Sequence, residues 1–301
     1  MLLGTDCGVY FKVSLQYQMP NAKFDSIIIL DAVPTIEAQT ARRLKEDIED
    51  ASIAAGRPLT VRREKIETVA DLRQTLGNLK DELLRNPIYP WIHLDGHGVK
   101  EETGFVTANH EYCTWAELNE LLTPINVTLG LNIFLILSMC QGGSFATSIR
   151  TTDRAPVLAL IGPVREISSN DVVADYSPFY TTFIRTNSIK KALNSLDARH
   201  SSPLYYRTNA ETFFYEVWRS YKHNQCNPAS LSARAENIRS KLNADSTPIL
   251  PDVTTLEAQL LAIEPVQFER FRDHYFMFDL YPENRERFEV TYEAASAYTA
   301  S

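Results

Sequence analysis

A histidine and a cysteine stand out because each directly follows a hydrophobic run and has glycines beside it. His97 lies between two glycines, and two further glycines follow Cys140 after one intervening residue. A cysteine attacks as its thiolate, and a neighbouring histidine is the usual base that generates that thiolate. Glycines let a substrate backbone approach closely and leave backbone N–H groups free for an oxyanion, a role we assign to Gly98 and Cys140. The pair predicts nucleophilic catalysis by a thiol.

The elements that precede these residues must bring them together, because they are far apart in the sequence. Residues 89–94 and 131–137 are hydrophobic runs that we interpret as strands buried on both faces. In open parallel sheets, functional residues collect at the carboxyl ends of the strands. If these two strands are neighbours, their ends lie only ~5 Å apart. His97 and Cys140 would then face one cleft.

The remaining pattern predicts an α/β fold. Three further hydrophobic runs are interpreted as strands: 27–30, 59–61 and 157–161. Apolar residues at helical spacing occupy 41–55 and 69–83, with Thr68 as the expected N-cap of the second segment. Strands that alternate with helices of this length form βαβ units. We therefore expect a mostly parallel sheet with helices on both faces, followed after residue 176 by a helical, aromatic-rich chain.

Two short motifs resemble those of caspase-like cysteine proteases, in particular the CHAT branch related to separase. They are His93–Gly98 (HLDGHG) and Leu137–Cys140 (LSMC), within a resemblance that covers about residues 24–185. The resemblance implies a caspase-like α/β/α sandwich and a cysteine endopeptidase. Cys140 would attack a peptide carbonyl, while His97 protonates the leaving amine and activates the water. It also implies control by an activator or by processing, and a role in signalling or antiviral defence.

A substrate pocket is expected on the loops after the first and fifth strands. Asp31 ends the first strand, and three acidic residues follow the fifth: Glu166, Asp171 and Asp175. An acidic pocket would bind arginine or lysine side chains through charge-assisted hydrogen bonds. Basic residues in the same region would instead favour acidic substrates: Arg150, Arg154 and Arg165. We favour a preference for basic side chains, with Asp31 as the main pocket residue.

Three other interpretations were weighed. A catalytically silent caspase-like adaptor would be marked by loss of the cysteine or the histidine, and both are present. A receiver-like module would need an acidic cluster at the strand ends to hold Mg²⁺, and only Asp31 and Asp95 come near. A zinc site would use the nearest potential ligands, which are His93, His97, His110 and Cys113. The first two are four residues apart, which spans ~13 Å on a strand, so we disfavour zinc. His93 is instead expected to pack in the sheet or against the site.

Composition and charge indicate an ordinary globular chain. The 301 residues carry a net charge of −8, which argues against nonspecific binding to nucleic acid or anionic membranes. The N-terminus lacks a leader pattern, and four scattered cysteines make no disulfide framework, so we expect a cytoplasmic protein with reduced thiols. No cofactor is predicted, because phosphate-loop and dinucleotide motifs are absent. The charged run Arg62–Lys65 is expected to be a solvated face.

The expected organisation is a peptidase domain over residues 1–227, with residues 1–23 as a lead-in. Residues 228–301 are expected to form a mainly helical extension. This extension is either a regulatory or docking segment or a set of helices that completes the core of the same domain. The second alternative follows from its leucine stripes, which at helical spacing normally belong to a core.

Overall fold

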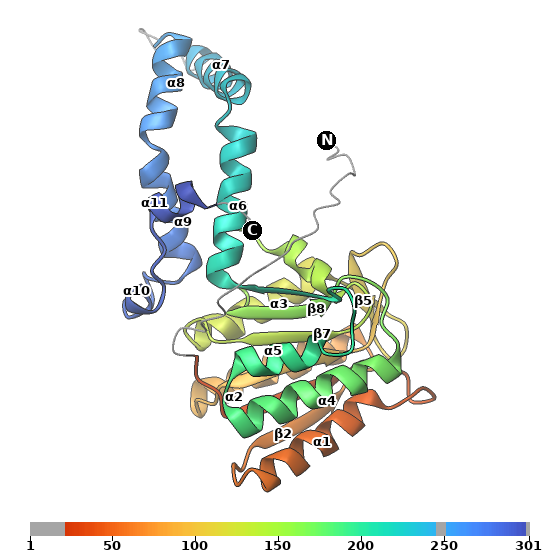
Figure 1. The fold of residues 1–301 in the computed structure, drawn as a ribbon. Helices are drawn as coiled ribbons and strands as arrows, with labels where there is room; N and C mark the ends of the chain where they lie inside the picture. Colours follow the sequence, from red (N-terminus) through yellow and green to blue (C-terminus); the bar gives the residue numbers. More distant parts are fainter. Residues whose placement is uncertain (1–21, 245–250, 299–301) are drawn as a thin grey trace.

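The computed structural model describes residues 22–244 and 251–298, which fold into helices on both faces of a central sheet (Figure 1). The sheet has six strands in the order β2-β1-β3-β7-β8-β9, and only β9 runs antiparallel to its neighbour. The strands are β1 (Ser26–Asp31), β2 (Thr60–Lys65), β3 (Pro90–Asp95), β7 (Phe134–Ser138), β8 (Ala159–Pro163) and β9 (Tyr205–Asn209). The predicted α/β fold with a mostly parallel sheet is confirmed.

The central strands are hydrophobic throughout because helices cover both of their faces. Successive side chains of a strand point to opposite faces. In β1, Ile28 and Leu30 join one buried cluster, and Ile27 and Ile29 join the other. The first face is covered by α2 (Val69–Arg85), α3 (Trp115–Thr128) and α6 (Ala210–Gln225), and the second by α1 (Thr40–Ala54), α4 (Ser169–Thr186) and α5 (Ile189–Asp197).

Helix α2 begins at the predicted cap. The Thr68 side chain accepts a hydrogen bond from the Asp71 N–H at 3.1 Å, and the Asp71 carboxylate accepts one from the Thr68 N–H at 2.8 Å. This reciprocal pair satisfies two N–H groups that the first turn of a helix leaves without partners. Thr114 caps α3 in a similar way, by accepting from the N–H of Glu117 at 3.1 Å. Side-chain chemistry visible in the sequence therefore fixes where both helices start.

Short elements extend the chain beyond the ends of β3 and β7. A small antiparallel sheet follows β3 and consists of β4 (His97–Gly98), β5 (Gly104–Val106) and β6 (Tyr112–Thr114). A short 3₁₀-helix, η1 (Gly142–Ser148), follows β7. His97 therefore lies in a strand of its own, and Cys140 lies in the turn between β7 and η1.

The chain beyond α6 forms C-terminal helices, and only the later part of this segment shares a core with the sheet. The helices are α7 (Pro228–Ala244), α8 (Val253–Ala262), α9 (Glu264–Tyr275), α10 (Asn284–Arg287) and α11 (Tyr292–Ala297). Figure 1 shows α6 to α9 as an arm that rises from the sandwich. Phe268, Phe276 and Phe288 nevertheless belong to the buried cluster that covers one face of the sheet. Side chains after α8 thus contribute to the core beside the sheet, and a regulatory or docking role for residues 228–301 stays a prediction.

Two further observations bear on the predicted organisation. Residues 1–21 of the expected lead-in lie outside the described residues. Within the part of the chain that the structure describes, no helix combines the length and the hydrophobicity needed to cross a membrane.

Candidate active site

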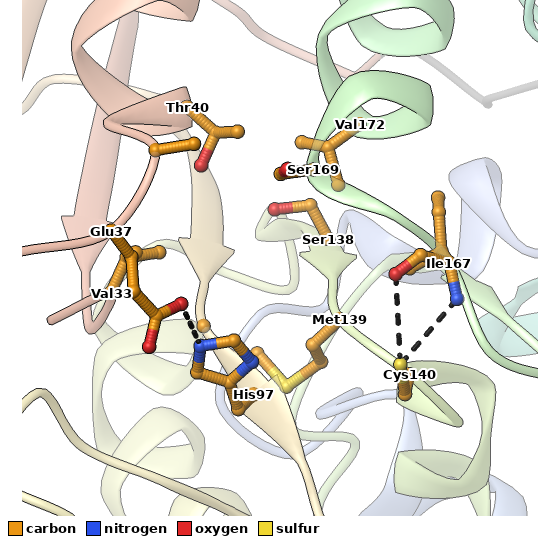
Figure 2. A pocket seen from close by; sticks show the side chains of 12 residues that line it. Val33, Glu37, Thr40, His97, Ser138, Met139, Cys140, Ile167, Ser169 and Val172 are labelled. Carbon is orange, nitrogen blue, oxygen red and sulfur yellow. Dashed lines mark hydrogen bonds and ion pairs between the residues drawn. The ribbon is translucent and has the colours of Figure 1, made fainter.

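His97 and Cys140 lie at the carboxyl ends of two adjacent strands of the central sheet. Strands β3 and β7 are parallel neighbours, as predicted, with Asp95 paired to Ser138 at their carboxyl ends. His97 follows β3 by two residues, and Cys140 follows β7 by two residues. Both side chains line one pocket (Figure 2).

Gly98 seats the strand that carries the histidine directly on the turn that carries the cysteine. A Cβ added at Gly98 would lie 1.7 Å from the carbonyl oxygen of Cys140, so only glycine fits there. The backbones of β4 and of the cysteine turn are therefore in contact. Gly142 and Gly143, in contrast, are buried against side chains of β7 and β9. The sequence suggested that these two glycines let a substrate backbone approach. In the structure they instead allow close packing within the protein.

Cys140 stands at the start of a sharp turn. Gln141 has a positive φ of 57°, a left-handed conformation that turns the chain immediately after the cysteine. The half-buried Sγ accepts a hydrogen bond from the Ile167 N–H at 3.4 Å and lies 3.7 Å from the Ile167 carbonyl oxygen. A backbone N–H aimed at sulfur stabilises negative charge, which is the charge of a reactive thiolate.

Glu37 holds the imidazole of His97. Its Oε2 lies 2.7 Å from Nε2 of His97, and the two side chains are 41% and 47% exposed. In Figure 2, the second ring nitrogen faces the side of the pocket that carries Cys140. Because Nε2 is bound to Glu37, Nδ1 is the atom left to exchange a proton at the pocket. Sequence reasoning named no residue that orients His97 and so missed Glu37.

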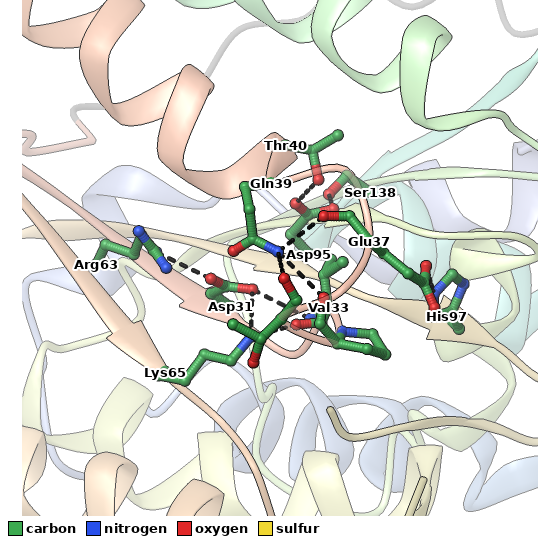
Figure 3. Close-up of polar contacts among 12 residues, drawn as sticks. Asp31, Val33, Glu37, Gln39, Thr40, Arg63, Lys65, Asp95, His97 and Ser138 are labelled. Carbon is green, nitrogen blue, oxygen red and sulfur yellow. Dashed lines mark hydrogen bonds and ion pairs between the residues drawn. The ribbon is translucent and has the colours of Figure 1, made fainter. Parts of the chain in front are cut away.

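The loop between β1 and α1 keeps Glu37 in place. Gln39 Nε2 donates hydrogen bonds to the carbonyl oxygens of Pro34 at 3.1 Å and Glu37 at 3.0 Å. From the other side, Lys65 Nζ donates to the carbonyl oxygen of Val33 (Figure 3). This loop follows the first strand at the edge of the sheet where His97 and Cys140 lie. Its position is the sequence signal by which Glu37 could have been found.

A chain of buried hydrogen bonds lies directly beneath the pocket. Asp95 accepts hydrogen bonds from the Ser138 hydroxyl at 2.7 Å and from the Thr40 hydroxyl. Ser138 Oγ lies 2.8 Å from Nε2 of His93, and the Tyr180 hydroxyl lies 2.8 Å from Nδ1 of the same ring. The prediction that His93 packs in the sheet or against the site is confirmed.

Burial determines which groups in this chain of hydrogen bonds carry a proton. It lowers the pKa of His93 to about 3, so that imidazole is neutral. Burial also raises the pKa of Asp95 to about 6, although hydrogen bonds from Thr40 and Ser138 oppose this change. An ionised carboxylate only accepts hydrogen bonds. At neutral pH Ser138 therefore donates to Asp95 and receives the Nε2–H of His93, while Tyr180 donates to Nδ1.

The structure corrects the prediction that Asp31 forms a substrate pocket. Its side chain is 1% exposed and is paired with Arg63 at 2.9 Å and Lys65 at 3.3 Å (Figure 3). It also accepts a hydrogen bond from the Val33 N–H at 3.1 Å. The Asp31 carboxylate is thus neutralised within the protein and does not line the pocket. The run Arg62–Lys65 lies in the edge strand β2, where its side chains are partly exposed, and two of them, Arg63 and Lys65, bind Asp31.

The acidic residues after β8 are likewise bound to other parts of the protein or lie outside the pocket lining. Asp175 is fully buried and is bound by Arg199 at 3.0 Å, His200 at 2.6 Å and Tyr205 at 2.6 Å. Asp171 belongs to the cap of α4, where hydrogen bonds from Ser168 lower the pKa of its carboxyl. Glu166 is exposed and does not line the pocket. The expected acidic pocket is therefore not formed by these residues.

The basic candidates do not form a pocket either. Arg154 pairs with Asp279 at 2.6 Å, and Arg165 donates to the Ser202 hydroxyl at 3.2 Å. Arg150 is exposed, and none of the three arginines lines the pocket. A charged side chain of a substrate thus meets no opposite charge from any residue that sequence reasoning proposed for its recognition.

No family model matches the chain, and no curated protein matches it. The geometry described above is therefore what bears on its function.

The residues considered as zinc ligands, a site that the sequence disfavours, are not gathered into a metal site among the described residues. Within residues 22–244 and 251–298, no three histidine, cysteine, aspartate or glutamate side chains lie close enough to hold a metal ion. Both ring nitrogens of His93 are bound to Tyr180 and Ser138, and one nitrogen of His97 is bound to Glu37. Hydrogen bonds to protein groups therefore occupy ring nitrogens that a metal would need.

The environments of the thiols predict their order of reactivity. Burial raises the pKa of Cys113 to about 12 and also raises the pKa of Cys226. Cys140, at the pocket, receives a backbone N–H on its sulfur. We therefore expect limiting iodoacetamide at pH 7.5 to label Cys140 at least about tenfold faster than Cys113 or Cys226. Peptide mapping by mass spectrometry measures the order, and equal labelling of Cys140 and Cys226 would contradict it.

Proposed function

We propose that this protein is a cysteine endopeptidase similar to the caspase-like proteases, with Cys140 as nucleophile and His97 as general acid and base. The observation that carries the proposal is that both side chains line one pocket at the ends of two paired strands. The contact between Gly98 and the Cys140 backbone supports it further. This arrangement supplies the nucleophile and the proton carrier that peptide hydrolysis requires.

The proposed reaction has two stages. The Cys140 thiolate attacks the peptide carbonyl carbon, and the C–N bond breaks as protonated His97 gives its proton to the leaving amine. Water then attacks the resulting thioester, giving a proton to His97 as the carbon–sulfur bond breaks. Backbone N–H groups of Gly98 and Cys140 would stabilise the oxyanion in both stages. Among the described residues the Cys140 N–H donates no hydrogen bond, so it is free for this role.

The resemblance to CHAT and separase proteases supports a setting for this activity. It favours a cytoplasmic enzyme that acts on protein substrates, is controlled by an activator protein or by processing, and takes part in signalling or antiviral defence. Neither a nucleic acid nor a membrane is proposed as a partner, in keeping with the net charge of −8. No cofactor is needed, because thiol and imidazole together carry out both stages.

A peptide-library cleavage profile tests the proposed activity. The protein is incubated with a proteome-derived peptide library, alone and with candidate activator proteins, and new N-termini are identified by mass spectrometry. We expect cleavage that is lost after alkylation of Cys140. Cleavage that persists after alkylation, or no cleavage under any condition despite a labelled thiol, would overturn the proposal.

The alternative is a catalytically silent adaptor, which one observation favours. Sγ is bound to Ile167 and the imidazole to Glu37, and within the described residues no hydrogen bond joins His97 to Cys140. Catalytic contacts are often long in the absence of substrate, so this geometry is also that of a resting enzyme. An adaptor would bind its partner without cutting it, and the cleavage profile separates the two functions.

Glu37 has a testable part in the proposed mechanism. We expect Glu37→Ala to lower kcat by less than about tenfold with little change in KM, because a half-exposed pair contributes at most about 1 kcal/mol. Glu37→Gln keeps a hydrogen bond to the ring and should restore part of the loss. Steady-state kinetics on a library-derived peptide measure both variants. A change confined to KM would instead place Glu37 in substrate binding.

A further inference from the structure

The cavity beside Cys140 reaches between two helix starts. Its far end is formed by Thr40 from the first turn of α1 and by Ser169 and Val172 from the first turn of α4. Ser138, from the end of β7, also lines it, and His97 and Cys140 lie toward its other end (Figure 2). A side chain that enters here would therefore pass the sulfur and come to rest between α1 and α4.

The position of the cavity relative to Cys140 Sγ determines which residue of a substrate can place its side chain there. The attacked carbonyl carbon must come within ~3.5 Å of Sγ. The side chain nearest to that carbon belongs to the residue immediately before the scissile bond. Because the cavity begins at Cys140, this residue is the one whose side chain can occupy it.

The lining of the cavity is almost free of charge. The only ionisable side chains in the lining besides Cys140 are Glu37 and His97, which bind each other. The remaining lining residues are apolar or hydroxylic, among them Thr40, Ser138, Ser169 and Val172. A charged side chain placed here would lose its hydration, and the charged groups nearest to it are already bound within the protein. Glu37 is bound to His97, and Asp95 is bound by Thr40 and Ser138.

The size of the cavity excludes large side chains as well. Its volume is about 70 Å³. A cavity of about 150 Å³ can bind one benzene ring, so this one, about half that size, has room for only a few methyl-sized groups. Val172 is 4% exposed, so the wall it forms is fixed by packing within α4.

The base of the cavity offers hydrogen-bond acceptors. Thr40 and Ser138 both give their hydroxyl protons to Asp95, which lies beneath them. A hydroxyl that donates its only proton still has lone pairs with which to accept. Ser138 already receives the Nε2–H of His93, so Thr40 is the hydroxyl best placed to accept a hydrogen bond from a small side chain that carries a hydroxyl group.

We infer that this cavity selects a small, uncharged side chain, namely alanine, serine or threonine, immediately before the scissile bond. The inference rests on the proposed endopeptidase function and replaces the preference for arginine or lysine expected from the sequence. Its central residue is Val172, whose side chain limits the length of what fits.

Peptides that differ only in the residue before the scissile bond test the preference. We expect kcat/KM for alanine, serine and threonine to exceed that for lysine, arginine and aspartate by at least about 100-fold, and that for leucine by about tenfold. Val172→Ala should raise the leucine-to-alanine ratio of kcat/KM about tenfold. Val173→Ala removes the same atoms from the next residue, outside the cavity lining, and should leave that ratio unchanged. Preferred cleavage after a charged residue, or equal ratios in both variants, would overturn the inference.

A second measurement separates this inference from the proposed function. Peptidyl chloromethyl ketones with alanine, leucine, lysine or aspartate at the same position alkylate Cys140 without any need for hydrolysis. We expect the alanine probe to label Cys140 at least about tenfold faster than the lysine and aspartate probes. Such selectivity without cleavage of any peptide would sustain the cavity assignment and reject the endopeptidase. Equal labelling rates would reject the cavity assignment whether or not peptides are cleaved.

Discussion

Replacement of Cys140 by alanine is expected to lower kcat for peptide cleavage by at least about 10⁴-fold, because Cys140 carries the only thiol among the described residues that line the pocket. The free energy of unfolding should change by less than about 1 kcal/mol, since the half-buried sulfur makes only weak hydrogen bonds to Ile167. Initial rates on a library-derived peptide and urea unfolding at pH 7 measure the two quantities on the same preparation.

Cys226→Ala is the matched control for this substitution. Cys226 is also half-buried and lies at the end of α6, away from the pocket. Loss of its thiol should leave kcat unchanged, which separates the chemistry of Cys140 from a general effect of thiol removal. If Cys140→Ala retained more than about a hundredth of the activity, a different nucleophile would be at work and the roles assigned to His97 and Gly98 would fall with it.

Most of the fold could be predicted because local signals determine it. The continuous hydrophobic run in β1 and the capping box of α2 are readable without knowledge of the tertiary structure. Strand β9 and the small sheet β4–β6 were missed, and both depend on partners. Tyr205–Asn209 has little hydrophobic character and becomes a strand by pairing antiparallel with β8 at the edge of the sheet.

The candidate site was only half predictable for a related reason. The positions of His97 and Cys140 follow from the ends of two strands, which hydrophobicity marks. The state of an acidic residue, in contrast, depends on which cation reaches it from elsewhere in the chain. Asp31 is neutralised by Arg63 from the neighbouring strand, and Asp175 by Arg199 from beyond α5. Pairing of this kind is set by tertiary structure, so charge at a strand end alone does not define a pocket.

The buried hydrogen bonds beneath the pocket make the stability of the protein depend on two opposing pKa shifts. Burial raises the pKa of Asp95 from 3.8 to about 6, so between these values the folded protein holds a proton that the unfolded chain lacks. This makes stability fall as pH rises. Burial lowers the pKa of His93 from 6.5 to about 3, so there the unfolded chain holds the extra proton. This makes stability fall as pH drops. Each effect amounts to about 1.4 kcal/mol per pH unit, so the two cancel between about pH 4 and pH 6.

Asp95→Asn removes one of the two opposing effects. As the pH drops from 6 to 4, we expect the free energy of unfolding of this variant to fall relative to that of wild type. The expected fall is about 1.4 kcal/mol for each pH unit, about 3 kcal/mol in all. Asparagine retains an oxygen that can accept from Thr40 or Ser138, so the variant should still fold at pH 7. Urea unfolding at half-unit steps of pH, with wild type measured in parallel, gives the difference and cancels the titration of groups common to both proteins.

His93→Gln should reverse the sign of the difference, and this reversal makes the argument specific. Without His93, only the Asp95 effect remains, so stability relative to wild type should rise as pH drops from 6 to 4. Two variants that merely damaged the core would be destabilised by similar amounts at every pH. Opposite slopes require instead two opposing pKa shifts beneath the pocket, a lowered pKa of His93 and a raised pKa of Asp95. Both side chains are hydrogen-bonded to Ser138. Parallel curves for all three proteins would show that the pKa values of these two groups do not differ between the folded and unfolded states as argued.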